Sequence, residues 1–244
     1  MSEEQIDLRN TKFTVGIPCY GNLPIFTAIS LIDTFRFFDH AGIQLNYAIE
    51  IGNSIVDSAR NNVVHMFLKE SDHQKLIFID SDIVWNAEDL ARLCCWSTKY
   101  PIVAAAYPTK VEGNHKFLGD YYRDPDNENQ VVQNEYGLVK MTAIGLGFCI
   151  IDRSVFEMMS PDTCKYKDSV HGENVTRFFA TTTDKDQFVG EDIYFLRRWT
   201  KQYGGDLWVD PTINLGHVGT KVYKGNFLDS LIYFNNEQKL LEKT

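Results

Sequence analysis

The first 110 residues of the chain alternate between two hydrophobic patterns. Short runs of apolar and β-branched residues favour strands, and longer segments with apolar residues three and four positions apart favour helices. Strands that alternate with helices form βαβ units, whose crossovers place the strands in one sheet. The sequence therefore predicts an α/β fold with a mostly parallel central sheet flanked by helices. The expected strands span residues 12–18, 45–51, 75–79 and 102–107, and the expected helices span 24–39, 55–66 and 87–99.

The expected helix over residues 24–39 follows a candidate N-cap at Asn22 and carries Pro24 in its first turn, where proline is tolerated. Its apolar residues fall on one stripe at helical spacing. A stripe of this kind normally faces the core of a globular protein. The stripe consists of Ile25, Ile29, Ile32 and Phe35.

The second half of the chain is less regular. Residues 112–136 are polar and predict loops or a short hairpin, and residues 160–188 have almost no apolar periodicity. A segment without regular structure that is as long as 160–188 is usually functional or mobile in a compact domain. The remaining patterns predict strands over 138–144, 147–153 and 207–210 and helices over 153–159, 191–203 and 227–242.

Composition excludes several classes of protein. The 33 acidic and 24 basic residues give a formal charge of −9, whereas general nucleic-acid binders carry a surplus of lysine and arginine. An aromatic content of 13% is too high for a disordered chain. No stretch approaches the roughly 20 apolar residues of a membrane span, and the polar start MSEEQIDLRN is unlike a signal or transit peptide. Because the five cysteines form no CxxC pair, we expect reduced thiols and a cytoplasmic location.

Two aspartates follow the third expected strand. In IFIDSDIVW, Asp80 and Asp82 stand one residue apart where the apolar run of residues 75–79 ends. Ligands bind at the carboxyl ends of strands in open parallel sheets, and two carboxylates there can converge on a hard divalent cation such as Mg²⁺ or Mn²⁺. In the alternative interpretation, Asp80 caps the turn and Asp82 is solvated. The strand context favours a metal site.

Beyond this motif, the chain resembles the GT-A glycosyltransferases, in particular the family-2-like enzymes of large viruses and phages, such as the rhamnosyltransferase domain of chlorella viruses. The resemblance spans about residues 12–225 and implies one GT-A catalytic domain over 1–244. Residues 1–110 would form a Rossmann-like nucleotide-sugar-binding half, and residues 111–244 an irregular acceptor-side half with a C-terminal helix. The ordered landmarks are VGIPCYG (15–21), SARNNVV (58–64), IFIDSDIVW (77–85), IGLGFCIIDRSVFE (144–157), GEDIYFLRRW (190–199) and, more loosely, LGHVGTKVYKG (215–225).

The resemblance also implies which residues bind the donor. Pro18 and Tyr20 would contact the nucleotide base, although a plain strand-to-helix turn is an equally good explanation of them. Arg60 would contact the base or the diphosphate, whereas its apolar neighbours one turn away also suit an arginine that pairs with a structural carboxylate. Asp57 is a candidate for the ribose. The remaining donor candidates are Asp80, Ser81 and Lys221.

Glu191 and Asp192 open the expected helix over residues 191–203. Carboxylates are favourable at a helix N-terminus without any catalytic role. Inverting sugar transfer, however, needs a carboxylate that takes the proton of the acceptor hydroxyl. The resemblance assigns this role to Asp192, with Glu191 as second choice. Adjacent helical residues point about 100° apart, so only one of them is expected to face the site.

His217, in NLGHVG, is the third candidate metal ligand beside Asp80 and Asp82, because related enzymes complete the metal shell with a C-terminal histidine. A single histidine is more often a surface or core residue. The resemblance also implies that Gly145 and Gly147 leave room for a sugar ring. Trp85 is the best candidate for stacking on a sugar, although tryptophan more often belongs to the core.

Together these features predict a metal-dependent glycosyltransferase that moves a sugar from a nucleoside-diphosphate donor, with UDP-sugars favoured, to an acceptor hydroxyl. Direct displacement would invert the anomeric configuration, and residues 160–188 would act as an acceptor loop or lid. The acceptor could be a glycan, a protein or a hydroxymethylated DNA base. A DNA acceptor would need a basic track, whose candidates are Lys165, Lys167, Arg197, Arg198 and Lys201.

Two other functions stay open from the sequence. A nucleotidyltransferase also combines an α/β sheet with metal-binding aspartates, but it usually binds its triphosphate with a basic glycine-rich loop, and GIPCYGNLP contains no lysine or arginine. A non-catalytic module that binds sugar or protein could use the same scaffold. If a virus encodes the chain, the expected location is the host cytoplasm.

Overall fold

The computed structural model describes residues 6–69, 72–112, 116–124, 127–168 and 172–232. Within these ranges an eight-stranded central sheet has the order β2–β1–β3–β10–β5–β15–β9–β6. The pairings β1–β2, β1–β3 and β5–β15 are parallel. The other four pairings are antiparallel, so that only β9 and β10 run against the remaining six strands. The expected α/β fold with a mostly parallel central sheet is therefore confirmed. The strands span β1 Phe13–Cys19, β2 Leu45–Ile51, β3 Lys75–Ile79, β5 Ile102–Ala104, β6 Gly119–Tyr121, β9 Val139–Ile144, β10 Phe148–Asp152 and β15 Trp208–Val209.

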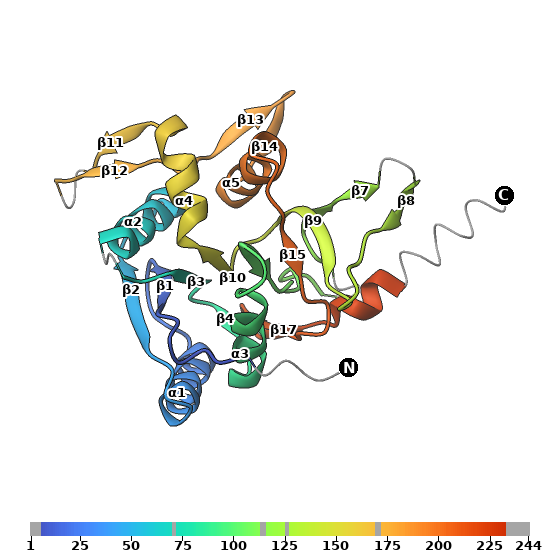
Figure 1. The fold of residues 1–244 in the computed structure, drawn as a ribbon, viewed down its shortest axis with the longest axis horizontal. Helices are drawn as coiled ribbons and strands as arrows, with labels where there is room; N and C mark the ends of the chain where they lie inside the picture. Colours follow the sequence, from blue (N-terminus) through green and yellow to red (C-terminus); the bar gives the residue numbers. More distant parts are fainter. Residues whose placement is uncertain (1–5, 70–71, 113–115, 125–126, 169–171, 233–244) are drawn as a thin grey trace.

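Helices cover both faces of this sheet (Figure 1). Helices α2 (Val56–Lys69), α4 (Arg153–Met159) and α5 (Glu191–Arg197) pack on one face, and α1 (Ile25–His40) and α3 (Ala87–Trp96) pack on the other. The alternation of side chains along β3 supplies both layers, because Leu76 and Phe78 join the first core and Ile77 and Ile79 the second. This strand is thus apolar throughout, as expected for a strand that is covered on both sides.

Helix α1 forms where expected, but most of its apolar stripe does not face the core. Ile25, Ile29 and Ile32 are 67%, 48% and 58% exposed, and the buried positions are Thr27, Ser30, Thr34 and Phe38. The reason is a pair of hydrogen bonds to Trp85. Ser30 Oγ donates to the Trp85 carbonyl at 2.9 Å, and Trp85 Nε1 donates to Thr34 Oγ1 at 2.9 Å. Trp85 is consequently a core residue that is 4% exposed and does not stack on a ligand.

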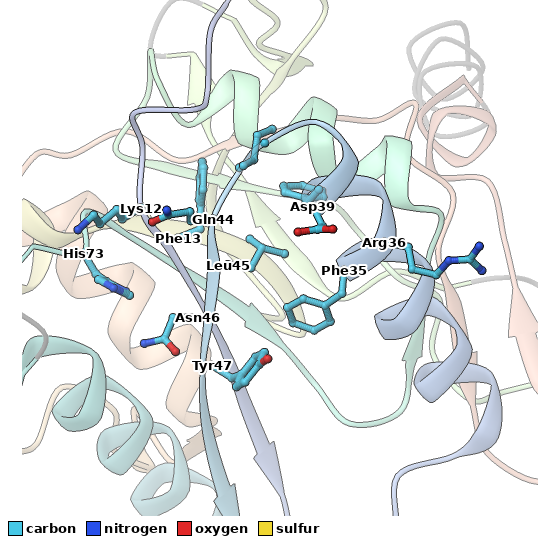
Figure 2. A pocket seen from close by; sticks show the side chains of 13 residues that line it. Lys12, Phe13, Phe35, Arg36, Asp39, Gln44, Leu45, Asn46, Tyr47 and His73 are labelled. Atoms are coloured by element: carbon cyan, nitrogen blue, oxygen red, sulfur yellow. The ribbon is translucent and has the colours of Figure 1, made fainter.

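The C-terminal part of α1, from Phe35 to Asp39, borders an open hollow. The hollow has a volume of about 840 Å³ and lies between α1 and the edge strand β2. Phe35 of α1 and Tyr47 of β2 approach each other beside it, with ring centroids 5.0 Å apart (Figure 2). Tyr47, Ile49 and Ile51 of β2 are exposed on this side. The hollow is larger than either pocket of the candidate site described below, but it lies on a different part of the molecule.

A second, three-stranded sheet has the order β17–β16–β4. It comprises β4 (Ile83–Val84), β16 (Gly216–Val218) and β17 (Val222–Lys224). Strand β4 follows the Asp80–Asp82 motif directly, and in the antiparallel register His217 lies opposite Ile83. This pairing, which the sequence patterns did not indicate, brings the C-terminal part of the chain to the end of β3.

The segment 160–188, expected to be a long loop, contains regular structure in its described part. A 3₁₀ turn, η1 (Ser160–Asp162), precedes the hairpin β11 (Lys165–Lys167)–β12 (Asn174–Thr176), and a second hairpin, β13 (Thr182–Asp184)–β14 (Gln187–Val189), follows. Three-residue strands are too short to show a periodicity in the sequence. The segment that connects the two hairpins contains two buried residues, Phe178 and Phe179. The expected hairpin within 112–136 is present as β7 (Arg123–Asp124)–β8 (Asn127–Val131).

The last expected helices are present with different lengths. After α5, residues Arg198–Gln202 continue as a π-helix, η2, so the helical stretch over 191–203 is not uniform. Residues 227–232 are helical, and the rest of the expected helix over 227–242 lies outside the described residues. Within the described residues, no helix has both the length and the apolar character that crossing a membrane requires.

Candidate active site

The turn between β3 and β4 positions the two aspartates. The backbone N–H of Asp80 donates to the Gly147 carbonyl at 2.9 Å, and the N–H of Ile83 donates back to the Asp80 carbonyl at 3.1 Å. The N–H of Val218 donates to the Asp82 carbonyl at 2.7 Å, which fastens β16 to the same turn. Both carboxylates therefore leave a rigid backbone at the carboxyl edge of the central sheet.

Asp82 lies beside two nitrogen atoms. Its Oδ2 is 3.5 Å from His217 Nε2 and 2.5 Å from Lys110 Nζ. The Nδ1 of His217 is 2.9 Å from the Pro108 carbonyl, which can only accept, so Nδ1 carries the proton and Nε2 faces Asp82 with a lone pair when the ring is neutral. Burial by itself would raise the pKa of Asp82. The hydrogen bond from His217, which requires the protonated ring, and the hydrogen bond from Lys110 outweigh this effect and lower the pKa to about 2.

Asp80 has a different partner, the guanidinium of Arg60 on α2. This side chain is 3% exposed and donates from Nη2 to Asp80 Oδ1 at 2.9 Å and from Nε to Glu191 Oε1 at 3.0 Å. Burial alone would lower the pKa of Arg60, but the charges of Asp80, Glu191 and Asp192 outweigh it and raise the pKa. Arg60 is thus an ion-paired residue beneath the site, and it does not line the pocket beside Pro18 and Tyr20.

The three expected metal ligands are therefore divided. Asp82 and His217 face each other, whereas Asp80 is turned toward Arg60. Burial raises the pKa of Asp80, and the attraction of Arg60 only partly offsets it. In the part of the chain that the structure describes, no group of three or more His, Cys, Asp or Glu side chains is arranged to hold a metal ion.

A first pocket opens next to the aspartates, with a volume of about 270 Å³. Six of the sequence-predicted residues line it: Pro18, Tyr20, Asp80, Ser81, Asp82 and His217. Two others do not. The Asp57 carboxylate accepts hydrogen bonds from the backbone of Ser58 and Thr181, at 2.8 and 3.3 Å. Lys221 pairs with Glu112 at 2.5 Å on the surface.

A second pocket, of about 480 Å³, is also lined by His217, and Asp192 lines it too. Burial, followed by the charge of Glu191, raises the pKa of Asp192. Its Oδ1 accepts a hydrogen bond from the Ile193 N–H at 2.7 Å, and no ion pair among the described side chains involves it. Glu191, in contrast, is held by Arg60. As expected for adjacent residues of a helix, only one of the two lines the pocket: Asp192 does, and Glu191 contacts Arg60 instead.

Tyr107 lines both pockets, together with His217. The rings of these two residues meet edge to face with centroids 5.1 Å apart. A Cβ atom at Gly145 would lie 2.4 Å from the Tyr107 hydroxyl oxygen, and one at Gly147 would lie 2.8 Å from both its ring and Asp80 Oδ2. Tyr107 thus packs against both glycines, which were expected to leave room for a sugar ring, and Gly145 also lines the second pocket.

Neither Tyr107 nor Lys110 was predicted from the sequence. A signal was present, because both follow an apolar strand pattern, as Asp80 and Asp82 do, and the carboxyl ends of β3 and β5 lie at the same sheet edge. The expected strand over 102–107 extended through Tyr107, whereas β5 ends at Ala104. Tyr107 and Lys110 therefore lie beyond the end of the strand, where they line the second pocket.

The candidate basic track is only partly accessible. Arg197 pairs with Asp120 at 2.8 Å, and the buried Arg198 donates to Thr163 Oγ1 at 3.1 Å. The exposed members of the set are Lys165, Lys167 and Lys201.

The fold and the site define an α/β protein with two adjoining pockets at the carboxyl edge of its central sheet. No family model and no curated protein matches the chain. Among solved structures, it is similar to A197 from STIV, with a TM-score of 0.52, 19% identity and 86% of each chain covered. At this identity the likeness shows a shared fold.

Two weaker likenesses are to proteins whose structures bear glycosyltransferase names. GalNAc-T7, solved with UDP, GalNAc and Mn²⁺, has a TM-score of 0.49 at 12% identity, covering 92% of this chain and 47% of that one. A glycosyltransferase involved in the glycosylation of the major capsid of PBCV-1 has a TM-score of 0.35 at 10% identity, covering 60% of this chain and 62% of that one.

Proposed function

We propose that the protein is a GT-A-type glycosyltransferase that moves a sugar from a nucleoside-diphosphate donor to an acceptor hydroxyl. One observation carries the proposal: two pockets meet at Tyr107 and His217, one holding Asp82 and the other holding Asp192. Sugar transfer needs such a pair of compartments. One must bind an anionic leaving group, and the other must present a base to the incoming hydroxyl.

The pocket with Asp82 is the proposed donor side. Pro18 and Tyr20 offer flat apolar surface to a nucleotide base, and UDP is the favoured nucleotide. Asp82 and His217 fit a Mn²⁺ or Mg²⁺ ion, because a carboxylate and an imidazole with a fixed Nε2 lone pair face one point. Asp80 would join them through water. A bound divalent cation would supply positive charge to the departing diphosphate.

The pocket with Asp192 is the proposed acceptor side. Asp192 would take the proton of the acceptor hydroxyl while the hydroxyl oxygen attacks the anomeric carbon. The bond from that carbon to the donor phosphate oxygen breaks, and its electron pair leaves with the diphosphate, so the anomeric configuration inverts. The raised pKa of Asp192 suits a base, since a carboxylate that holds a proton more strongly accepts one more readily. Glu191 is a positioning residue, because Arg60 neutralises it.

The hairpin β13–β14 is the proposed lid. It ends one residue before Gly190, which lines the acceptor-side pocket, and Phe188 on it is 78% exposed. The contacts of Arg197 and Arg198 leave little of the basic track for DNA. A glycan or another small hydroxyl compound is therefore the proposed acceptor class.

A thermal-shift screen tests the donor side. The wild-type protein and Asp82→Asn are heated with UDP, GDP, dTDP and CDP, each with and without Mn²⁺. Because a ligand of the folded state raises its stability, we expect one nucleotide to stabilise the wild type when Mn²⁺ is present, and Asp82→Asn to lose this dependence. If none of the four stabilises the wild type, the proposal is wrong.

Turnover of the matching sugar donor then separates the proposed function from its alternatives. A nucleoside diphosphate as product supports glycosyl transfer. Pyrophosphate as product would indicate a nucleotidyltransferase. Nucleotide binding with no donor turnover under any metal condition would indicate a binding module.

A further inference from the structure

Lys110 connects the two pockets through one contact. Its Nζ is 2.5 Å from Oδ2 of Asp82, the same oxygen that lies 3.5 Å from His217 Nε2. Lys110 lines the acceptor-side pocket with Asp192, whereas Asp82 lines the donor-side pocket. The two side chains are only partly exposed, at 38% and 30%. This ion pair therefore lies at the junction where a donor phosphate would meet the acceptor.

Lys110 has a defined position at this junction. It follows Pro108, whose carbonyl contacts His217, and Thr109, whose N–H donates to the Lys116 carbonyl at 2.8 Å. Its side-chain stem passes close to Gly219 in the turn after β16, where a Cβ atom would lie 3.2 Å from Lys110 Cδ. The backbone is thus fixed, while the ammonium sits on a flexible stem of four carbons that can turn to another partner.

Lys110 and a divalent cation would compete for the same oxygen of Asp82, because Oδ2 is the atom that faces both Lys110 Nζ and His217 Nε2. In the proposed function Asp82 and His217 hold a divalent cation, which needs the oxygen that now accepts the hydrogen bond from Lys110. Two positive charges a few ångströms apart repel each other strongly in a partly buried site. The ammonium must therefore leave Asp82, and the nearest new anion would be the diphosphate of the donor.

We propose that Lys110 is an exchangeable cation of this site. It neutralises Asp82 in the free protein and moves to a phosphate oxygen of the donor when Asp82 binds a divalent cation. The inference rests on the proposed function, since it needs a donor with a diphosphate. In that state Lys110 is a donor-binding residue, whose ammonium donates a hydrogen bond to the oxygen on which negative charge collects as the sugar departs.

The first test measures competition with Mn²⁺ alone. Lys110→Met keeps the length of the side chain and removes its charge, and Lys116→Met removes an exposed charge outside both pockets as a matched control. Binding is followed by the electron paramagnetic resonance signal of free Mn²⁺. Because the competing ammonium is gone, we expect Lys110→Met to bind Mn²⁺ on the order of two- to fivefold more tightly than the wild type. Lys116→Met should match the wild type, and equal affinities for Lys110→Met and the wild type would overturn the proposal.

The second test measures the move to the donor. With Mn²⁺ at saturation, UDP, GDP, dTDP and CDP are titrated into each variant by calorimetry. The nucleotide that binds the wild type should bind Lys110→Met about tenfold more weakly, because a charged hydrogen bond to phosphate is lost, whereas Lys110→Arg should retain most of the affinity. Unchanged nucleotide affinity in Lys110→Met would overturn this half of the proposal.

Asp82→Asn distinguishes failure of this inference from failure of the proposed function. If Asp82→Asn binds Mn²⁺ as well as the wild type, or if no nucleotide binds the wild type, the proposed function itself is wrong. If Mn²⁺ binding depends on Asp82 and a nucleotide binds, but Lys110→Met changes neither affinity, only the role of Lys110 is wrong.

Discussion

Asp192 and Glu191 are neighbours in the chain but differ in their partners. Arg60 binds Glu191, whereas Asp192 faces the acceptor-side pocket with no ion-pair partner among the described residues. We expect Asp192→Asn to lower transfer by about 10²- to 10⁴-fold, the usual contribution of a general base. Nucleotide binding should be retained, since Asp192 does not line the donor-side pocket. Glu191→Gln is the matched control and should reduce transfer much less. A larger loss in Glu191→Gln than in Asp192→Asn would reverse the two assignments.

The protonation of Asp192 should determine how kcat/KM falls at low pH. Burial and the charge of Glu191 raise the pKa of Asp192, and the base must be deprotonated to act. The kcat/KM should therefore fall as the pH decreases through a value above the ordinary pKa of aspartate, and it should level off at higher pH. Glu191→Gln removes one of these causes, so the midpoint should move to lower pH. A midpoint that does not move would show that Glu191 has no influence on the base.

At the scale of elements, α1 shows where sequence patterns are insufficient. Its span was predicted to within a residue at each end, because helical periodicity and turn residues are local signals. Its orientation was not, because the inward face is chosen by contacts with Trp85, which lies more than fifty residues away in the sequence. Periodicity identifies an apolar stripe on a helix. It does not show which face of the helix packs against the sheet when polar residues on another face form buried hydrogen bonds.

A pair of substitutions tests this orientation. We expect Ile29→Ser to change the free energy of unfolding by no more than about 0.5 kcal/mol, because the side chain is half exposed. Phe38→Ala, at a fully buried position of the same helix, should cost about 3–5 kcal/mol. Urea denaturation measures both. A cost for Ile29→Ser close to that of Phe38→Ala would mean that the stripe is buried.

The pairing of β16 with β4 explains why the site was predicted only in part. Asp80, Asp82, Asp192 and His217 could be named from motifs, and the strand-end rule placed the two aspartates at the sheet edge. The contact of His217 with Asp82, however, depends on a two-residue strand that is too short to show a pattern. Lys110 and Tyr107 depend on where β5 ends, which is also set by long-range contacts.

This pairing can be disturbed at Gly216. A Cβ atom there would lie 2.8 Å from Val222 Cγ1 and 3.3 Å from Val84 Cβ. We expect Gly216→Ala to displace β16, to cost about 1–3 kcal/mol of stability, and to weaken Mn²⁺ binding through His217. Because Val222→Ala removes the nearest clashing atom, the double variant should recover most of the Mn²⁺ affinity. Val222→Ala alone is the control. If the double variant does not recover its Mn²⁺ affinity, the loss in Gly216→Ala is not caused by the clash with Val222.

At the scale of the whole molecule, the site joins segments that are distant in the sequence. Arg60 comes from α2, Asp80 from the end of β3, and Glu191 from the start of α5. The buried guanidinium of Arg60 thus connects Asp80 on the proposed donor side with Glu191 on the proposed acceptor side. Asp80 and Glu191 are both largely buried, and carboxylates that are removed from water need such a partner.

We therefore expect Arg60→Met to destabilise the protein by about 3–5 kcal/mol, since it leaves two largely buried carboxylates without a counter-charge. Replacing Glu191 by Gln in the same variant removes one of the uncompensated charges and should restore part of the loss. Arg92→Met removes a half-exposed arginine that contacts Thr212, and it should change the free energy of unfolding by no more than about 0.5 kcal/mol. Urea midpoints for the four proteins provide the measurement. Equal midpoints for Arg60→Met and Arg92→Met would show that the two sides of the site are held together by the surrounding core rather than by Arg60.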